Sequence, residues 1–245
     1  MKKTAAAILI FVFAASMINI DGSRDVIKKM HDRYAGKWYK TLSFNQTTEV
    51  YKNDSLQRTE TWYENIKFPN DFRIDFGNPG SGDAVIFRND SSYFFKTGTL
   101  SAVRQDKNDL TFLLGGMYFY SFDAVISKMS SLGYDLNKFH EDVWKGKNVY
   151  VIGAAKGEDS VNQIWIDKDN FNIVRMLKFE GKQKEEGLFE NHIKIEGGYS
   201  ESVVYFYIDG RLVQIEKYHD IKANVDIDNS IFDPGNFVML KRGAY

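Results

Sequence analysis

The sequence predicts a mainly β, antiparallel fold with a few covering helices. Aromatic residues make up 15% of the chain, with 19 Phe and 14 Tyr, and these residue types favour strands. Short segments rich in threonine and aromatics alternate with turn-forming residues, which is typical of an antiparallel meander. Two stretches, one near the N-terminus and one in the middle, instead repeat apolar residues at helical spacing.

The N-terminus has the pattern of a secretory signal peptide. Lys2 and Lys3 precede an apolar run from Ala5 to Ile20, and the run is short for a retained membrane anchor, which is the alternative. Cleavage is expected after Ser16 or nearer Gly22. The chain has no cysteine, so it offers none for lipid attachment. We therefore expect a signal peptide over residues 1–22 and a soluble mature protein in the periplasm or outside the cell.

Two amphipathic helices are predicted. Apolar residues from Val26 to Trp38 share one helical face, which predicts a helix over about 24–36 with Ser23 as its N-cap. Apolar residues from Phe122 to Leu132 recur in the same way, between Ser121 and Gly133, which suits a capped helix ended by glycine. The apolar segment 113–120 contains two glycines and is expected to be a flexible connection.

The remaining segments read as strands. Before the middle helix they are Tyr39–Tyr51, Leu56–Ile66, Phe72–Phe76, Ala84–Arg88, Ser92–Lys96 and Thr99–Gln105; after it they are Val149–Ala155, Gln163–Asp167, Ile173–Glu180, Leu188–Tyr199, Ser202–Ile208, Leu212–Ile221 and Phe237–Leu240. No Pro-, Gly- or Ser-rich linker separates the two groups. We therefore expect one domain over residues 23–245, with a helical insertion near 121–142.

Several of these strands are apolar on both faces, among them 149–152, 164–166 and 203–207. A sheet with one face in water should alternate apolar and polar residues. The second face must therefore be covered, and the candidates are the two helices, a partner subunit or a bound ligand.

Recognisable catalytic motifs are missing from the sequence. His140-Glu141-Asp142 is the densest histidine cluster, but adjacent residues do not point at one metal, and we interpret it as a solvated loop. Asp167-Lys168-Asp169 lacks the glycine and closing glutamate of a calcium loop and is expected to be a hairpin turn. We predict no enzyme activity, no metal and no cofactor. The net charge of -1 and the absence of a basic block argue against a nucleic-acid partner.

Four segments carry a resemblance to a known family. These are Phe44-Asn45-Gln46-Thr47, the stretch Trp62–Asp75 with its Lys67-Phe68-Pro69 turn, the stretch Ala84–Phe95, and Val225–Gly235 with its Phe232-Asp233-Pro234-Gly235 ending. Their order and spacing span nearly the whole mature chain. In these features the sequence resembles the LolA/LolB-like periplasmic lipoprotein-carrier family, the outer-membrane lipoprotein-sorting group.

The resemblance implies an unclosed antiparallel β-barrel, a half-barrel, with a helical lid over an apolar cavity for acyl chains. It also implies that the partners are lipid or lipidated protein, and possibly inner- and outer-membrane envelope proteins. One position departs from the pattern, because the carriers place an arginine before the proline where this chain has Phe68. That departure favours a general binder of apolar ligands over standard lipoprotein transfer.

We therefore predict a periplasmic carrier or binder of an apolar ligand. Burying an acyl chain contributes roughly 0.8 kcal/mol per methylene, and such a site needs wide apolar walls but few polar groups. The candidate wall residues are Phe44, Trp62, Phe72, Ile74, Phe94, Trp165, Met176 and Phe206, and the candidate lid residues are Phe122, Ile126 and Met129. The alternatives are an envelope sensor or scaffold that binds a protein on the same concave sheet, and an envelope enzyme.

Overall fold

The structure is a computed structural model that describes residues 20–106 and 108–240. The predicted signal peptide lies outside the described residues except for its last three positions. Among the described residues, no helix is both long enough and apolar enough to cross a membrane.

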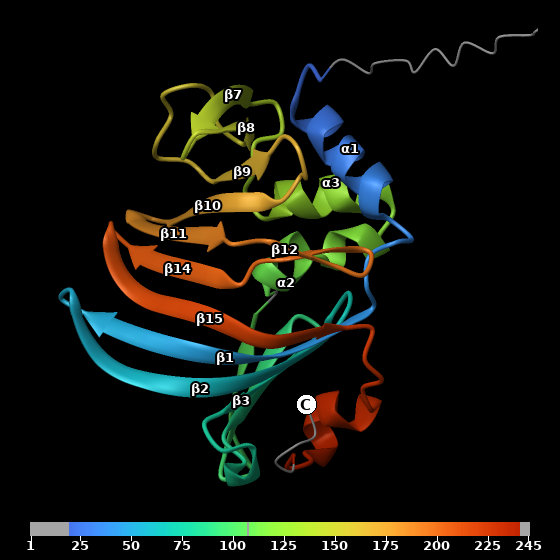
Figure 1. Cartoon of the computed structure of the whole chain (residues 1–245), viewed down its shortest axis with the longest axis vertical. Helices are drawn as coiled ribbons and strands as arrows, with labels where there is room; N and C mark the ends of the chain where they lie inside the picture. Colours follow the sequence, from blue (N-terminus) through green and yellow to red (C-terminus); the bar gives the residue numbers. More distant parts are fainter. Residues whose placement is uncertain (1–19, 107, 241–245) are drawn as a thin grey trace, which may run out of the picture.

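One antiparallel sheet of 13 strands forms the body of the protein, in the order β6-β5-β4-β3-β2-β1-β15-β14-β11-β10-β9-β8-β7. Strands β6 and β7 are its two free edges, so the sheet is curved but not closed (Figure 1). The predicted open antiparallel half-barrel is confirmed. The strands are β1 Thr41–Lys52, β2 Ser55–Lys67, β3 Asp71–Phe76, β4 Ala84–Arg88, β5 Ser91–Lys96, β6 Thr99–Gln105, β7 Phe139–Trp144, β8 Lys147–Ile152, β9 Gln163–Asp167, β10 Ile173–Glu180, β11 Gln183–Glu190, β14 Val203–Ile208 and β15 Arg211–Ala223.

Both predicted helices are confirmed, as α1 Ser23–Tyr34 and α3 Phe122–Ser131. Ser121 caps α3 by accepting a hydrogen bond from the Ala124 amide at 3.4 Å. The predicted N-cap of α1 is wrong by one residue: Gly22 holds that position. The Ser23 hydroxyl instead donates to the Lys138 carbonyl at 2.6 Å, and this bond ties the start of α1 to the segment leading into β7.

The stretch 109–119 contains more regular structure than predicted. It forms a five-residue helix, α2 Asp109–Leu113, and a 3-10 turn, η2 Gly116–Phe119. The Asn108 side chain caps α2 by accepting from the Thr111 amide at 3.1 Å. A Cβ added at Gly115 would lie 2.8 Å from the Phe68 ring, so this glycine is required by close packing. Figure 1 shows α2 inside the curve of the sheet.

Three local predictions are wrong. His140-Glu141-Asp142 lies in edge strand β7 and not in a loop, so the helical insertion ends before Phe139. The segment 188–199 is not one strand: β11 ends at Glu190, and a separate hairpin follows, β12 Ile193–Ile195 with β13 Gly198–Ser200. Residues 237–240 form no strand.

Apolar side chains pack on both sides of the β8–β10 region. On the inner side, Val26, Ile27 and Met30 of α1 and Val125 and Met129 of α3 pack with Ile152, Ile164 and Ile166 in the main core. On the outer side, Val149, Val151 and Val174 form a small second core with Trp144 and Trp165. The Arg175 guanidinium lies over both tryptophan rings, at 4.5 and 4.7 Å from their centroids. The second face is therefore covered by side chains of the sheet itself.

A C-terminal strap, residues 229–237, covers the outer face of β3 and β4. It contains the 3-10 turns η3 Asn229–Phe232 and η4 Pro234–Asn236. Arg73 of β3 is fully buried there, makes two hydrogen bonds to Asp75 at 2.8 and 2.7 Å, and donates to the Ile231 carbonyl at 3.0 Å. The ring of Phe237 lies under the same guanidinium at 4.7 Å. The Phe232-Asp233-Pro234-Gly235 ending thus packs on the outer face of β3, opposite the side chains of Phe72 and Ile74.

Candidate ligand cavity

An inner cavity of about 220 Å³ lies between the concave face of the sheet and α2. Alternate residues of adjacent strands form its wall, because successive side chains of a strand point to opposite faces. Phe44 of β1 faces Glu64 of β2, Glu64 faces Ile74 of β3, and Ile66 faces Phe72 across the strand pairs, and all of them line the cavity. Leu110 and Leu114 close it from the α2 side. The walls are mostly aromatic and aliphatic.

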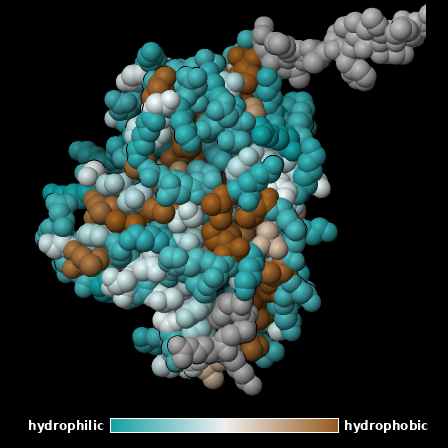
Figure 2. Space-filling model, viewed as in Figure 1, coloured by the Kyte–Doolittle hydropathy of each residue, from teal (hydrophilic) through white to brown (hydrophobic). Residues whose placement is uncertain are grey.

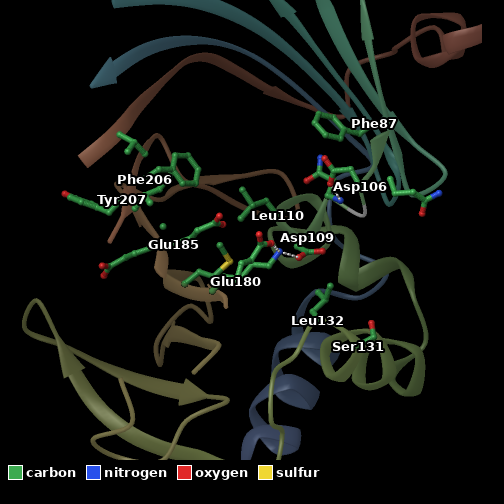
Figure 3. Close-up of a pocket in the computed structure, with 18 residues that line it drawn as sticks. Phe87, Asp106, Asp109, Leu110, Ser131, Leu132, Glu180, Glu185, Phe206 and Tyr207 are labelled. Carbon is green, nitrogen blue, oxygen red and sulfur yellow. Dashed lines mark hydrogen bonds and ion pairs between the residues drawn. The ribbon is translucent and has the colours of Figure 1, made fainter. Parts of the chain in front are cut away.

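A wider outer groove of about 810 Å³ adjoins the inner cavity. Phe87, Asn108, Leu110 and Phe206 line both spaces. Figure 3 shows Leu110 between Phe206 on one side and Phe87 on the other, with Leu132 of the α3 end below. The spaces therefore form one hollow with a deep apolar part and a broad mouth. In Figure 2 an apolar patch lies near the middle of the face shown, where Figure 1 places α2.

Helix α2 is the roof of the hollow and is held by an ion pair and by buried apolar side chains. Lys178 of β10 bridges to Asp109 at 2.8 Å, and the two side chains are 30% and 19% exposed. Partly exposed ion pairs contribute little to stability, roughly 0–1 kcal/mol. Phe112 and Leu113 of α2 are each 2% exposed and pack in the main core beneath it. These two buried side chains, more than the ion pair, hold α2 on the sheet.

The structure brings some predicted wall residues together and not others. Phe44, Phe72, Ile74 and Phe206 line the inner cavity, and Met176 and Phe206 line the outer groove. Trp62 packs against Phe76 at 5.0 Å and Phe94 lies under Arg104 at 4.9 Å, and neither lines the hollow. Trp165 lies in the small core on the outer face, so its assignment to the cavity wall is corrected.

The predicted lid helix is not the roof of the cavity. Ile126 and Met129 of α3 are buried in the main core, and Phe122 packs beside Arg24, Lys28 and His31 of α1. Only the end of α3 and the residue after it, Ser131 and Leu132, reach the outer groove. The roof is α2, for which the sequence predicted no element; the predicted apolar connection 113–120 begins only at its last residue, Leu113.

Phe68, at the position where the carrier family has arginine, lines the inner cavity. Its ring packs against Tyr39 at 5.5 Å and stacks on Phe119 at 5.8 Å. An apolar ring therefore replaces a charge at the edge of the roof. Arg73 is the only arginine in the stretch Trp62–Asp75, and it is buried on the opposite face of the sheet. No arginine of this stretch therefore lies beside the roof, where Phe68 is found.

Three glutamates in the cavity wall were not predicted: Glu64 of β2, Glu216 of β15, and Glu201 between β13 and β14. Burial raises the pKa of Glu64 well above its usual range, and the neighbouring Glu216 and Glu201 raise it further. Burial also raises the pKa of Glu201, to about 7. For Glu216, burial raises the pKa, while hydrogen bonds from Tyr218, Gln214 and Gln46 oppose the rise.

Two of these glutamates could have been noticed in the sequence, because each is a charged residue on an otherwise apolar face of a strand. Glu64 alternates with Trp62 and Ile66 on one face of β2, and Glu216 alternates with Tyr218 on one face of β15. Only the fold shows that Glu64 of β2 and Glu216 of β15, which are distant in the sequence, face one space. Within the described ranges, no group of three or more His, Cys, Asp or Glu is arranged to hold a metal ion.

Solved structures share this architecture. A DUF1329 family protein from Desulfovibrio piger matches with a TM-score of 0.57 at 12% identity, over 86% of this chain and 95% of the other. A LolA superfamily protein from Nitrosomonas europaea matches with a TM-score of 0.55 at 13% identity, over 87% of this chain and 98% of the other. A putative outer membrane lipoprotein-sorting protein domain from Vibrio parahaemolyticus matches with a TM-score of 0.59 at 9% identity, over 87% of this chain and 97% of the other.

The chain has the LolA-like fold. At these identities the likeness concerns the fold alone. No family model matches the sequence, and no curated protein matches it either. The function must therefore be inferred from the LolA-like half-barrel and from the cavity under α2.

Proposed function

We propose that this LolA-like protein is a periplasmic carrier or binder of an apolar ligand, either a lipid or the acyl chain of a lipidated protein. The observation that carries the proposal is the apolar inner cavity opening into a wider groove. Expulsion of water from such walls by a hydrocarbon chain is favourable by roughly 25 cal/mol per Å² of apolar surface buried. Binding of this kind needs no reactive group.

The path into the cavity supports a carrier. The outer groove reaches the cavity past Leu110 and Phe206, which line both. Because the ion pair that ties α2 to β10 beside the groove is partly exposed, we expect a displacement of the Asp109–Leu110 end of α2 to widen the entrance. A bound chain would then be covered on one side by α2 and on the other by the sheet.

Two further observations fit this function. The N-terminal pattern of Lys2, Lys3 and the following apolar run supports export to the periplasm. One protein with the same fold is described as an outer membrane lipoprotein-sorting domain, so the fold is compatible with handling lipidated proteins. Phe68 in place of the arginine supports a ligand that contacts only apolar side chains at the roof.

Native mass spectrometry of the full chain, purified from its source compartment without detergent, tests the proposal. We expect co-purified lipid, and uptake of a neutral fluorescent apolar probe by the delipidated protein. The variant Leu110→Trp should fill the hollow and lower probe affinity about tenfold, which corresponds to about 1.4 kcal/mol. Val143→Trp makes a comparable change on edge strand β7, where Val143 is 59% exposed, and should leave affinity unchanged.

Absence of lipid together with no probe uptake would refute the proposal. A stoichiometric protein partner recovered without lipid would favour the scaffold alternative, in which the same concave face binds a protein. Equal loss of probe affinity in both tryptophan variants would show that the probe binds outside the hollow.

A further inference from the structure

The inner cavity contains acids but no base. Glu64, Glu201 and Glu216 line it, and no Lys, Arg or His is among its lining residues within the described chain. Two tyrosines, Tyr39 and Tyr218, are its other titratable groups. A cavity that binds only hydrocarbon has no need of buried carboxyl groups, since burying each one costs free energy unless it is hydrogen-bonded or paired with an opposite charge.

Glu216 has partners within the protein. Its carboxyl accepts hydrogen bonds from the Gln214 side chain at 2.6 Å and from the Tyr218 hydroxyl at 2.9 Å. A role in holding β15 side chains in place therefore explains this residue without a ligand.

Glu64 has no such explanation. Its side chain lies in the cavity wall and the residue is only 5% exposed. In the part of the chain that the structure describes, no donor forms a hydrogen bond or ion pair with its carboxyl. The neighbours across the strands are Phe44 and Ile74, so an apolar residue would suit the sheet better. An unpartnered, buried acceptor that faces an empty space indicates a ligand with a donor.

The outer groove has the same sign of charge. Its lining includes five acids, Asp106, Asp109, Glu180, Glu185 and Glu186, and one base, Lys178. Lys178 is already paired with Asp109 at 2.8 Å, and Glu186 is paired with Arg175 at 2.6 Å. A mouth lined mostly by acids attracts cations and disfavours anions. Anionic amphiphiles are therefore poorly suited to this entrance, and cationic ones are well suited.

We propose that the inner cavity binds the ammonium group of an apolar amine, a hydrocarbon chain ending in a primary amine, with Glu64 as its acceptor. The inference rests on the proposed function and names the ligand class. The hydrocarbon part packs against the apolar residues shared with the groove, Phe87, Leu110 and Phe206. Glu201 lines the same space and supplies further negative charge when ionised. Burial and the neighbouring Glu216 and Glu201 raise the pKa of Glu64, and an ammonium ion bound beside its carboxylate would lower that pKa again.

Displacement of the neutral fluorescent probe at pH 7 by three nine-carbon ligands tests this inference. The ligands are nonylamine, 1-nonanol and nonanoic acid, which share a chain and differ in the end group. We expect nonylamine to bind about tenfold or more tightly than 1-nonanol, since a hydrogen bond between charged groups is stronger than one between neutral groups, and nonanoic acid to bind most weakly.

The variant Glu64→Gln should lower nonylamine affinity about tenfold and leave 1-nonanol affinity within about twofold. Glu60→Gln is the matched control, because Glu60 lies on the same strand but outside both spaces, and it should change neither affinity. Equal binding of amine and alcohol by the native protein, or an unchanged amine affinity in Glu64→Gln, would overturn this inference while leaving the proposed function intact. Failure of all three ligands to bind would refute the proposed function itself.

Discussion

The two halves of the sheet are covered in different ways. Over β8–β10, the helices α1 and α3 bury interlocking apolar faces, and Ile152, Ile164 and Val125 are at most 1% exposed. Over β1–β4, β14 and β15, the cover is α2, and the cavity remains beneath it. One curved sheet thus provides a packed core at one end and a container at the other. The difference lies in the length of the covering helices, since 12- and 10-residue helices bury a full apolar stripe and a five-residue helix does not.

Shortening a side chain in each half should give the largest difference in the free energy of unfolding. Met129 of the packed half is 1% exposed, so Met129→Ala should lower the free energy of unfolding by about 3 kcal/mol, because it opens a cavity in a full core. Leu110→Ala beside the existing cavity should cost less than about 1 kcal/mol, since few contacts are lost there. Chemical denaturation measures both, and equal losses would show that the two halves are packed alike.

The pH dependence of stability should distinguish the halves next. The pKa of Glu201 is raised from 4.5 to about 7 in the folded protein. Above pH 4.5 the unfolded chain therefore loses this proton while the folded protein keeps it, and stability falls as the pH rises to about 7. Glu201→Gln should remove this loss, so the variant should gain stability over the native protein by about 2 kcal/mol between pH 4.5 and pH 7.

The comparison with the variant is needed because His192 acts in the opposite direction. Burial lowers the pKa of His192 from 6.5 to about 4, so its contribution to stability is lost as the pH falls through that window. Both proteins contain His192, and its effect cancels in their difference. A difference that does not change with pH would contradict the raised pKa of Glu201.

Aromatic truncations on the two faces should separate binding from stability. Phe206→Ala removes a side chain that lines both the cavity and the groove, and it should weaken binding of the neutral probe about tenfold, or about 1.4 kcal/mol. Trp165→Ala removes a ring from the outer core and should leave probe affinity unchanged. Fluorescence titration measures both, and weaker binding in Trp165→Ala alone would place the ligand on the wrong face for our proposal.

Loosening α2 should give the smallest effect. Asp109→Asn removes the ion pair with Lys178 and should cost about 0.5 kcal/mol of stability. It should also speed probe entry, measured by stopped-flow fluorescence. Asp83→Asn breaks the Lys96 ion pair elsewhere on the surface and should leave the entry rate unchanged. Equal entry rates in both variants would indicate that α2 does not control access.

Much of the fold could be predicted from residue patterns. Threonine- and aromatic-rich segments between turn residues located most strands, and helical spacing located α1 and α3. Strand β7 was missed because Phe139–Trp144 mixes polar and apolar residues, which is common at a free edge. Residues 237–240 were predicted as a strand because they are apolar, but Phe237 stacks on Phe95 at 4.0 Å as part of the strap.

The candidate site was less predictable than the fold. Aromatic content indicated apolar walls, and Phe44, Phe72, Ile74, Met176 and Phe206 do line the hollow. The sequence could not show which face Trp165 would take, because its strand is apolar on both sides. It also could not show that a short segment, and not the longer helix α3, would become the roof.

Burial of Arg73 links the container to a distant part of the chain. The Arg73 guanidinium holds the Ile231 carbonyl, a partner 158 residues away, while Phe72 and Ile74 on either side of it face the cavity. Closing so long a loop is entropically costly, so we expect this contact to form late in folding. The strap therefore supports β3 from the outer face, directly behind two residues of the cavity wall.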